Sequence, residues 1–381
     1  MKFTSLLAPT VLFPFAAAIN FFSVTGLLVF AGLLGQSELA ADIAVTQGAV
    51  IAVFFSLSGN ARNLILANNS SNDNGHLFYF RIIIILPAAL AAFLLANSII
   101  DIPLVLILGL ILRKCTEWII ELELANREKS DDSIFAIKYI LVNAFGFSLL
   151  IISLAFSWLD LFYIILFVWA LLPATFLYSY VQKAWNINFE KSGFIKLFPH
   201  IGSSAVIGVT MFIFRIMLIT LVGKVWAGQM FTAYAIGGLA SSIYTHAIGP
   251  TVVLRRNARS SNMSYLYFLL CILVGILIWF SAPLFHSEQF LYGIGFSIIG
   301  GGVMLLAQQQ RLHLLQGLEK DVFTPDALIN ILFIASVPFA YYLFGQHILV
   351  VFFLWSALLN LSFYWPLAYK HQEKIIGKCI D

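Results

Sequence analysis

A few arginine, glutamine and histidine side chains stand inside stretches that are otherwise apolar, and these groups could bind a substrate. Arg215 is the clearest candidate for such a group, because it is the one full charge between Leu197 and Val222. A lone arginine inside hydrocarbon costs roughly 2.5–3.5 kcal/mol on insertion scales, so we expect it to face protein or water. A guanidinium binds phosphate and carboxylate groups bidentately. Arg215 is therefore either a site for a phosphate or sugar acid, or an arginine that snorkels to the outer headgroups.

A second polar cluster follows the apolar run Ile102 to Leu112. Arg113 and Glu117 are four residues apart, and Glu121 continues the same helical face, so these side chains can pair on one helix. Two interpretations stay open. This helix either lines a wet cavity from its midpoint inward, or leaves the bilayer early as an amphipathic extension.

A third cluster occupies the inner half of a later predicted helix, in the run AQQQRLHLLQG. Gln309, His313 and Gln316 share one helical face, while Gln308 and Arg311 share another. The matching arginines of the second and third clusters fit a basic inner vestibule. A solvated helix end explains them equally well.

Arg62 lies at the inner end of the second predicted helix, and Arg81 opens the third. Both are typical topology anchors, although Arg62 is also a candidate substrate contact. Acidic residues are absent from the predicted helices 8–33, 197–222 and 228–254, which favours an anionic substrate over a cationic one. The candidate substrate-binding residues are Arg215, Arg113, Arg311, Arg62, Gln309 and His313.

The composition requires a membrane to position these groups. The 381 residues are 61% hydrophobic and 10% charged, with a mean hydropathy of +0.94, whereas soluble domains carry about 25% charged residues. The apolar runs are continuous and not alternating, which excludes a β-barrel. Cys115, Cys271 and Cys379 have neither metal-ligand nor disulfide spacing. The sequence thus predicts an all-α integral membrane protein without a cofactor or a nucleic-acid partner.

Hydropathy predicts twelve transmembrane helices, of which the fourth and tenth are the weakest as hydrophobic segments. Their approximate spans are 8–33, 41–66, 77–97, 102–123, 134–156, 159–181, 197–222, 228–254, 264–284, 289–316, 325–345 and 347–369. With the N-terminus in the cytoplasm, 19 of the 21 lysines and arginines fall at cytoplasmic ends. The positive-inside rule predicts this asymmetry, so we expect both termini to be cytoplasmic.

The chain also has the pattern of a duplication. The predicted turn glycines Gly35 and Gly223 are 188 residues apart, about half the chain, and each follows an apolar helix. We therefore expect two six-helix bundles, at 1–181 and 197–381, joined by a polar cytoplasmic linker at 182–196. Such a repeat relates the bundles by an axis along the membrane normal, with a cavity between them.

Two hairpins carry a resemblance to a known family. The stretches LLGQSELAADIAVTQGAVIAVFFSLSGNARNLIL at 33–66 and FRIMLITLVGKVWAGQMFTAYAIGGLASSIYTHAIGP at 214–250 each join apolar helices through a glycine turn. With the six-plus-six layout, they resemble the polysaccharide-transporter branch of the multidrug/oligosaccharidyl-lipid/polysaccharide exporter superfamily. The positions that match are Gly35, Gly59, Gly223, Tyr234 and Pro250, together with Arg215 in helix seven.

The resemblance implies a V-shaped alternating-access carrier in a bacterial inner membrane. Its substrate would be an undecaprenyl-diphosphate-linked oligosaccharide, such as an O-antigen repeat unit, flipped for surface polysaccharide synthesis. A polysaccharide polymerase and a chain-length regulator are then candidate partners. The alternative is a multidrug or metabolite exporter of the same fold. No catalytic motif occurs, so we do not expect an enzyme; a membrane-embedded polymerase or ligase would need a large outer loop.

Overall fold

The described part of this computed structural model is helical throughout. It covers residues 9–58, 62, 65–66, 75–98, 100–177, 198–243, 259–285, 288–315 and 322–378. The helices are α1 (Pro9–Leu33), α2 (Ser37–Val50) continued by the π-helix η2 (Ile51–Phe55) and α3 (Ser56–Ser58), α5 (Gly75–Asn97), α6 (Leu104–Lys129), α7 (Ser133–Ala155), α8 (Leu159–Leu171) continued by the 3-10 helix η3 (Leu172–Phe176), α11 (Phe198–Val222), α12 (Lys224–Ile243), α14 (Arg259–Ser281) with η5 (Ala282–Leu284), α15 (Glu288–Leu315), α16 (Phe323–Phe344), η7 (Gln346–Val351) and α17 (Phe352–Lys378).

Each of the twelve predicted spans has a helical counterpart among the described residues. Ten of the described helices are long and apolar enough to cross a membrane, whereas α6 and α12 do not meet that criterion. The weakness of the fourth span is confirmed in α6. The predicted weakness of the tenth is wrong, because its apolar outer half, starting at Glu288, outweighs the polar inner end. The protein is a multi-pass membrane protein.

The two turn glycines act as predicted. Gly35 follows α1 with φ 81°, and Gly223 follows α11 with φ 79°. Side chains other than glycine rarely adopt this left-handed conformation, so glycine at these positions allows the chain to reverse at once into the next helix. α2 accordingly begins at Ser37 and α12 at Lys224.

The chain divides into two compact units, Met1–Ile216 and Met217–Asp381. The division predicted from the sequence falls earlier, in the segment 182–196. That segment lies outside the described residues, so the predicted linker stays a prediction.

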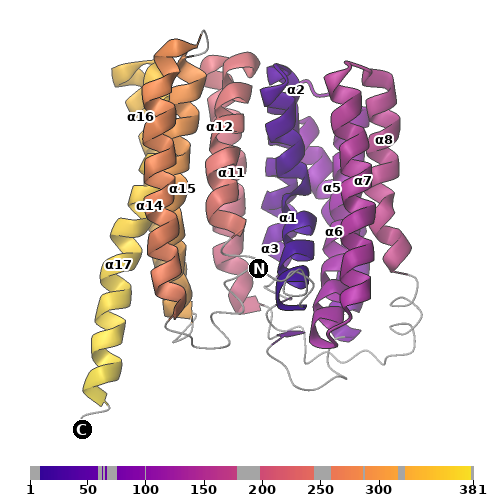
Figure 1. Ribbon diagram of the computed structural model, residues 1–381, viewed down its shortest axis with the longest axis horizontal. Helices are drawn as coiled ribbons and strands as arrows, with labels where there is room; N and C mark the ends of the chain where they lie inside the picture. Colours follow the sequence, from indigo (N-terminus) through magenta and orange to yellow (C-terminus); the bar gives the residue numbers. More distant parts are fainter. Residues whose placement is uncertain are drawn as a thin grey trace. The chain divides into compact units, whose positions relative to one another are not determined.

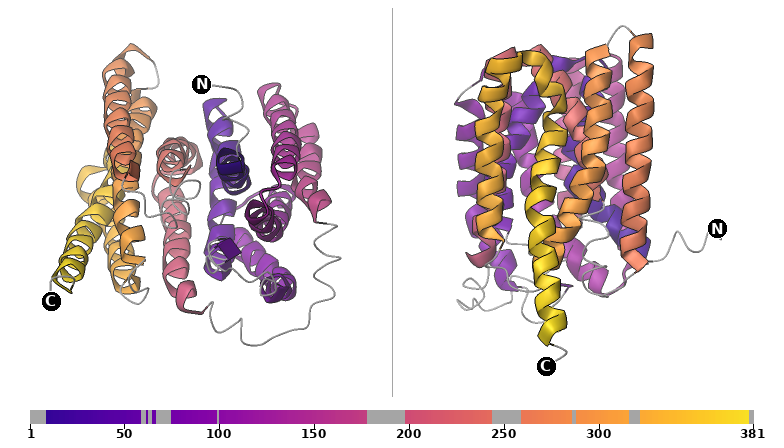
Figure 2. Two further views of the ribbon diagram at one scale, coloured as in Figure 1. Left: turned by 60° about the horizontal axis from the view of Figure 1, so that its bottom comes forward. Right: turned by 90° about the vertical axis from the view of Figure 1, so that its left-hand side faces the viewer.

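In the first unit, α2 and α6 lie at the centre. α1 packs against α2, α6 and α7, α5 packs against both α2 and α6, and α8 packs against α6 and α7 (Figure 1). Most of α2 is buried, as is the inner half of α6. In the second unit, α15 has the central place, in contact with α12, α14 and α17 (Figure 2).

The outer faces of the helices are apolar. On α5, Ile83, Leu86, Leu90 and Leu94 are all exposed, and their spacing of three and four residues places them on one stripe. A contiguous exposed apolar surface of this kind would be unstable in water and is expected against lipid. Several polar and charged side chains, among them Arg81, Arg113 and Glu117, are instead buried inside the first unit.

Candidate functional site

Arg215 lies on α11, in the part of that helix that belongs to the first unit. Its guanidinium reaches α2, where Nη1 donates to the carbonyl oxygen of Ala44 and Nη2 donates to Oε1 of Gln47 at 3.2 Å. The side chain is half-buried. Arg215 thus projects toward the neighbouring helix α2.

The surroundings of Arg215 are built from small and neutral polar residues. Gln47 donates through Nε2 to Oγ1 of Thr25 on α1, at 2.7 Å. This contact fixes the orientation of the amide, so that its oxygen faces the guanidinium. Gly48 leaves room for the arginine, since a Cβ atom there would lie 3.0 Å from Cδ of Arg215. Three helices, α1, α2 and α11, therefore contribute to one arginine site.

Arg215 has no carboxylate partner among the described residues. Arginine stays protonated in proteins, and a carbonyl and an amide oxygen satisfy its hydrogen bonds without neutralising its charge. A group of this kind attracts an anion, since charge-assisted bonds to phosphate or carboxylate are stronger than bonds to neutral acceptors.

Arg113 has a different environment. It is fully buried within the first unit. Its Nε donates to Oε1 of Glu117 at 2.7 Å, Nη1 donates to the carbonyl oxygen of Trp169 at 2.9 Å, and Nη2 donates to Oδ1 of Asn143 at 2.9 Å. The guanidinium carbon also lies 4.0 Å from the centre of the Trp169 ring, a cation–π distance.

A second layer of hydrogen bonds surrounds that ion pair. Tyr139 on α7 donates to Oδ1 of Asn20 on α1 at 2.6 Å, and Asn20 donates through Nδ2 to the carbonyl oxygen of Glu117 at 3.2 Å. The network joins α1, α6, α7 and α8. The charged half of α6 is thus enclosed by its own unit, an arrangement that neither sequence interpretation of this helix described.

Two further ion pairs extend along the same side of α6. Arg81 on α5 lies 2.9 Å from Oε2 of Glu121, and Arg62 lies 2.9 Å from Oε2 of Glu128. Both arginines are buried. The sequence analysis missed these interhelical partners. The sequence contains a signal for these pairs, because Glu121 and Glu128 follow the face of Glu117 at helical spacing. A carboxylate that is buried needs a cation as its partner.

Arg311 is paired within the second unit. Its Nη2 lies 2.8 Å from Oδ2 of Asp326 on α16, and Tyr364 on α17 donates to Oδ1 of the same carboxylate. Gln309 is buried on α15. His313 lies on the same helix, but its side chain is outside the described part of the chain.

The structure thus separates the predicted site residues into two kinds. Three of the predicted arginines pair with carboxylates, whereas Arg215 donates to two neutral groups that were not predicted as partners, the carbonyl oxygen of Ala44 and the amide oxygen of Gln47. Arg113 and Arg215 share no hydrogen-bond partner. A substrate contact at each predicted residue stays a prediction.

Solved structures with the same fold exist, although no family model and no curated protein matches the sequence. The MATE transporter VcmN of Vibrio cholerae, in its bent form, is similar with a TM-score of 0.63 at 13% identity, over 97% of both chains. The eukaryotic MATE transporter AtDTX14 gives a TM-score of 0.59 at 13% identity, over 98% of both chains.

A third similar structure is a MOP superfamily transporter from Pyrococcus furiosus. Its TM-score is 0.58 at 12% identity, over 100% of this chain and 99% of the other. Its description states that the reverse polarity of its binding pocket suggests a different function. At these identities the likeness establishes the fold alone. The chain therefore has the MATE transporter fold, an all-α membrane architecture of twelve helices in two bundles.

Proposed function

We propose that this chain is a membrane transporter that exports a small organic molecule, either a drug or a metabolite. The observation that carries the proposal is the likeness to MATE transporters, which extends over 97% of both chains in the case of VcmN. A fold alone does not define a substrate, so the substrate class has to be argued from the site. We expect transport without a catalysed reaction.

The site favours a substrate with an anionic group. Arg215 carries a positive charge among neutral partners, and α1, α11 and α12 contain no Asp or Glu, whereas α2 carries Glu38 and Asp42. A cationic drug would meet no countercharge on these three helices. The Pyrococcus furiosus structure, described as having a pocket of reverse polarity, supports the view that this fold accommodates more than one polarity.

A lipid-linked oligosaccharide is the second candidate substrate. The positive charge of Arg215 favours it, because the diphosphate of undecaprenyl-diphosphate offers two anionic groups to a guanidinium. In that case the protein works in a bacterial inner membrane as a flippase for surface polysaccharide synthesis. A polymerase and a chain-length regulator would then be its partners.

One experiment separates the two candidates. The gene is deleted, the growth medium is profiled for small anionic metabolites, and the lipid-linked intermediates and surface glycan are measured in the same cells. For an exporter, we expect one or more metabolites to disappear from the medium while the glycan is unchanged. Accumulated undecaprenyl-diphosphate oligosaccharide with loss of surface glycan would instead establish flipping.

The role of Arg215 is tested in the same cells. Because Arg215→Gln removes the charge, we expect transport to fall on the order of tenfold or more, the equivalent of one charge-assisted hydrogen bond. The control is Lys224→Gln, which removes a positive charge at the start of α12 and should leave transport unchanged. Normal transport by an abundant Arg215→Gln protein would exclude this residue from the site.

A further inference from the structure

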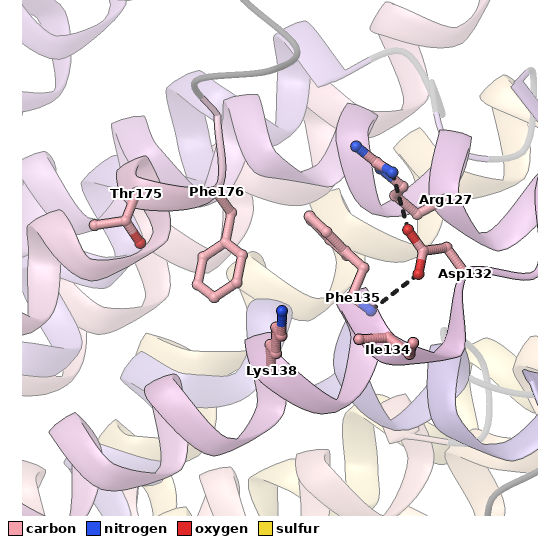
Figure 3. A pocket seen from close by; sticks show the side chains of 7 residues that line it. All are labelled: Arg127, Asp132, Ile134, Phe135, Lys138, Thr175 and Phe176. Atoms are coloured by element: carbon pink, nitrogen blue, oxygen red, sulfur yellow. Dashed lines mark hydrogen bonds and ion pairs between the residues drawn. The ribbon is translucent and has the colours of Figure 1, made fainter.

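A shallow cavity of about 350 Å³ opens on the first unit at the end predicted to face the cytoplasm. Figure 3 shows its lining, which comes from the end of α6, the start of α7 and η3. The lining residues are Arg127, Asp132, Ile134, Phe135, Lys138, Thr175 and Phe176. None of them belongs to the Arg215 site.

Three charged side chains line this cavity, Arg127, Asp132 and Lys138. Arg127 is held by Glu123 at 2.7 Å and by Asp132 at 2.9 Å. Asp132 also caps α7, because its Oδ1 accepts from the backbone N–H of Phe135 at 3.1 Å. Its side chain remains 31% exposed. Lys138, six residues beyond Asp132 in the sequence, has no hydrogen-bond or ion-pair partner among the described residues.

Lys138 stands on a lipid-facing stripe. Ile134, Leu141 and Phe145 are 67%, 63% and 66% exposed, and with Lys138 they follow one face of α7 at helical spacing. On the adjacent helix α8, the exposed Ile164, Val168 and Leu171 form a similar stripe, which leads to Thr175. Two apolar tracks thus run from the bilayer core to the cavity.

A lysine on such a stripe needs an anion close to the hydrocarbon boundary. An unpaired ammonium in hydrocarbon is costly, and long side chains extend toward the headgroups to avoid that cost. In Figure 3 the amine of Lys138 points into the cavity, between the rings of Phe135 and Phe176. The groups that a membrane offers at this depth are lipid phosphates.

We propose that this cavity binds the headgroup of a phospholipid that carries a primary amine, that is, a phosphatidylethanolamine. The phosphate lies on Lys138, and the ammonium lies on the half-buried carboxylate of Asp132, beside the contact of that carboxylate with Arg127. The acyl chains follow the two apolar tracks on α7 and α8. The site is independent of what the chain transports.

The choice of this headgroup follows from the charge count. The lining has two cations, Arg127 and Lys138, and one carboxylate, Asp132, and Arg127 is also paired with Glu123 outside the lining. The positive charge in excess is therefore that of Lys138, which faces the phosphate. A purely anionic headgroup would leave Asp132 facing its own sign of charge. A trimethylammonium group has no N–H to donate to a carboxylate, so phosphatidylcholine should bind more weakly.

The test is lipid binding to the purified full chain, measured by native mass spectrometry. Phosphatidylethanolamine, phosphatidylcholine and phosphatidylglycerol with identical acyl chains are titrated separately. We expect the ethanolamine lipid to bind most tightly. Lys138→Gln should weaken it on the order of tenfold, the equivalent of one charge-assisted hydrogen bond. Asp132→Asn should abolish the preference over phosphatidylcholine while keeping the cap of α7, because asparagine caps helices equally well.

The matched control is Lys129→Gln, which removes a positive charge at the same end of the unit but outside the cavity. It should bind all three lipids as the unchanged protein does. Equal binding of the three lipids, tighter binding of phosphatidylglycerol, or an effect of Lys129→Gln as large as that of Lys138→Gln would overturn the proposal. Complete displacement by glycerophosphoethanolamine, which has no acyl chains, would overturn the part assigned to the apolar tracks.

Discussion

At the scale of single residues, the arginines of this protein differ in what neutralises them. Arg62, Arg81, Arg113 and Arg311 each face a carboxylate on a helix of the same unit. The pairs of Arg81 and Arg311 join two helices, the pair of Arg113 lies within α6, and all of these pairs leave little free charge. Arg215 faces a carbonyl and an amide, so it retains its attraction for an anion. A role in packing is therefore the stronger interpretation for the first group, and a role in binding for Arg215.

Arg113→Met tests the packing role. The substitution leaves the buried carboxylate of Glu117 without its arginine. Breaking a buried pair from one side typically costs about 3–5 kcal/mol when the remaining charge is uncompensated. Lys114, whose Nζ lies 3.9 Å from Oε2 of Glu117, offsets part of that cost. We therefore expect a large fall in the thermal unfolding midpoint of the detergent-solubilised protein.

The double variant Arg113→Met/Glu117→Met is the matched control. It removes both charges and should recover most of the lost stability, since no isolated charge remains. If the double variant is as unstable as Arg113→Met, then packing around the guanidinium is what stabilises this region, and the ion pair is not.

Sequence spacing decided which of these contacts could be predicted. The Arg113–Glu117 pair lies within one helix turn, and it was predicted and is confirmed at 2.7 Å. The Arg215–Gln47 contact joins residues that are 168 positions apart. No local pattern encodes such a contact, because it depends on which helices pack and how they are rotated. Gln47 was for that reason missed, although Arg215 itself was found.

At the scale of elements, close helix contacts rest on single glycines. Gly237 and Gly238 are adjacent on α12, and their surroundings differ. A Cβ at Gly237 would lie 2.1 Å from the carbonyl oxygen of Ser297 on α15, whereas one at Gly238 would lie 3.9 Å from the Phe353 ring. Gly237 thus sets the distance between two central helices of the second unit, and Gly238 does not.

Gly237→Ala should consequently destabilise the protein by about 1–3 kcal/mol or more, since a methyl group would overlap backbone that cannot move away. The neighbouring Gly238→Ala has space, and it should be neutral or stabilise by up to about 1 kcal/mol, because alanine favours helix. Both are measured as unfolding midpoints. Equal effects of the two substitutions would contradict the contact between α12 and α15.

Helix ends were harder to predict than helices. Apolar runs located all twelve spans, but α6 continues to Lys129, beyond its predicted end at 123, and the Arg127–Glu123 pair lies along this polar extension. Likewise, α12 begins at Lys224 and not at 228, since the glycine turn before it needs a single residue.

At the scale of the whole molecule, the positive-inside distribution and an even number of helices predict that both termini face the cytoplasm. Two turns with left-handed residues give suitable test positions, Asp131 between α6 and α7 and Ser157 between α7 and α8. If α7 crosses the membrane, these two turns lie on opposite sides.

The measurement is labelling with a membrane-impermeant maleimide in a chain in which Cys115, Cys271 and Cys379 are replaced by alanine. We expect Ser157→Cys to react in intact cells and Asp131→Cys to react only after permeabilisation. The reverse pattern would invert the predicted orientation. Reaction of both from outside would remove α7 from the set of crossings.

The π-helical stretch η2 lies between α2 and α3. It allows the segments on its two sides to rotate about the helix axis by different amounts. Residues 51–55 form a π-helical turn, whose hydrogen bonds span one residue more than those of the α-helix on either side. If the extra residue shifted out of residues 51–55 into the next turn, the residues that follow would rotate by about 100° around the helix axis and advance by about 1.5 Å. Gln47 would keep its place beside Arg215 while the far end swung, with few hydrogen bonds exchanged. The π-helical stretch thus gives this helix a point at which one half can rotate while the other half keeps its contacts.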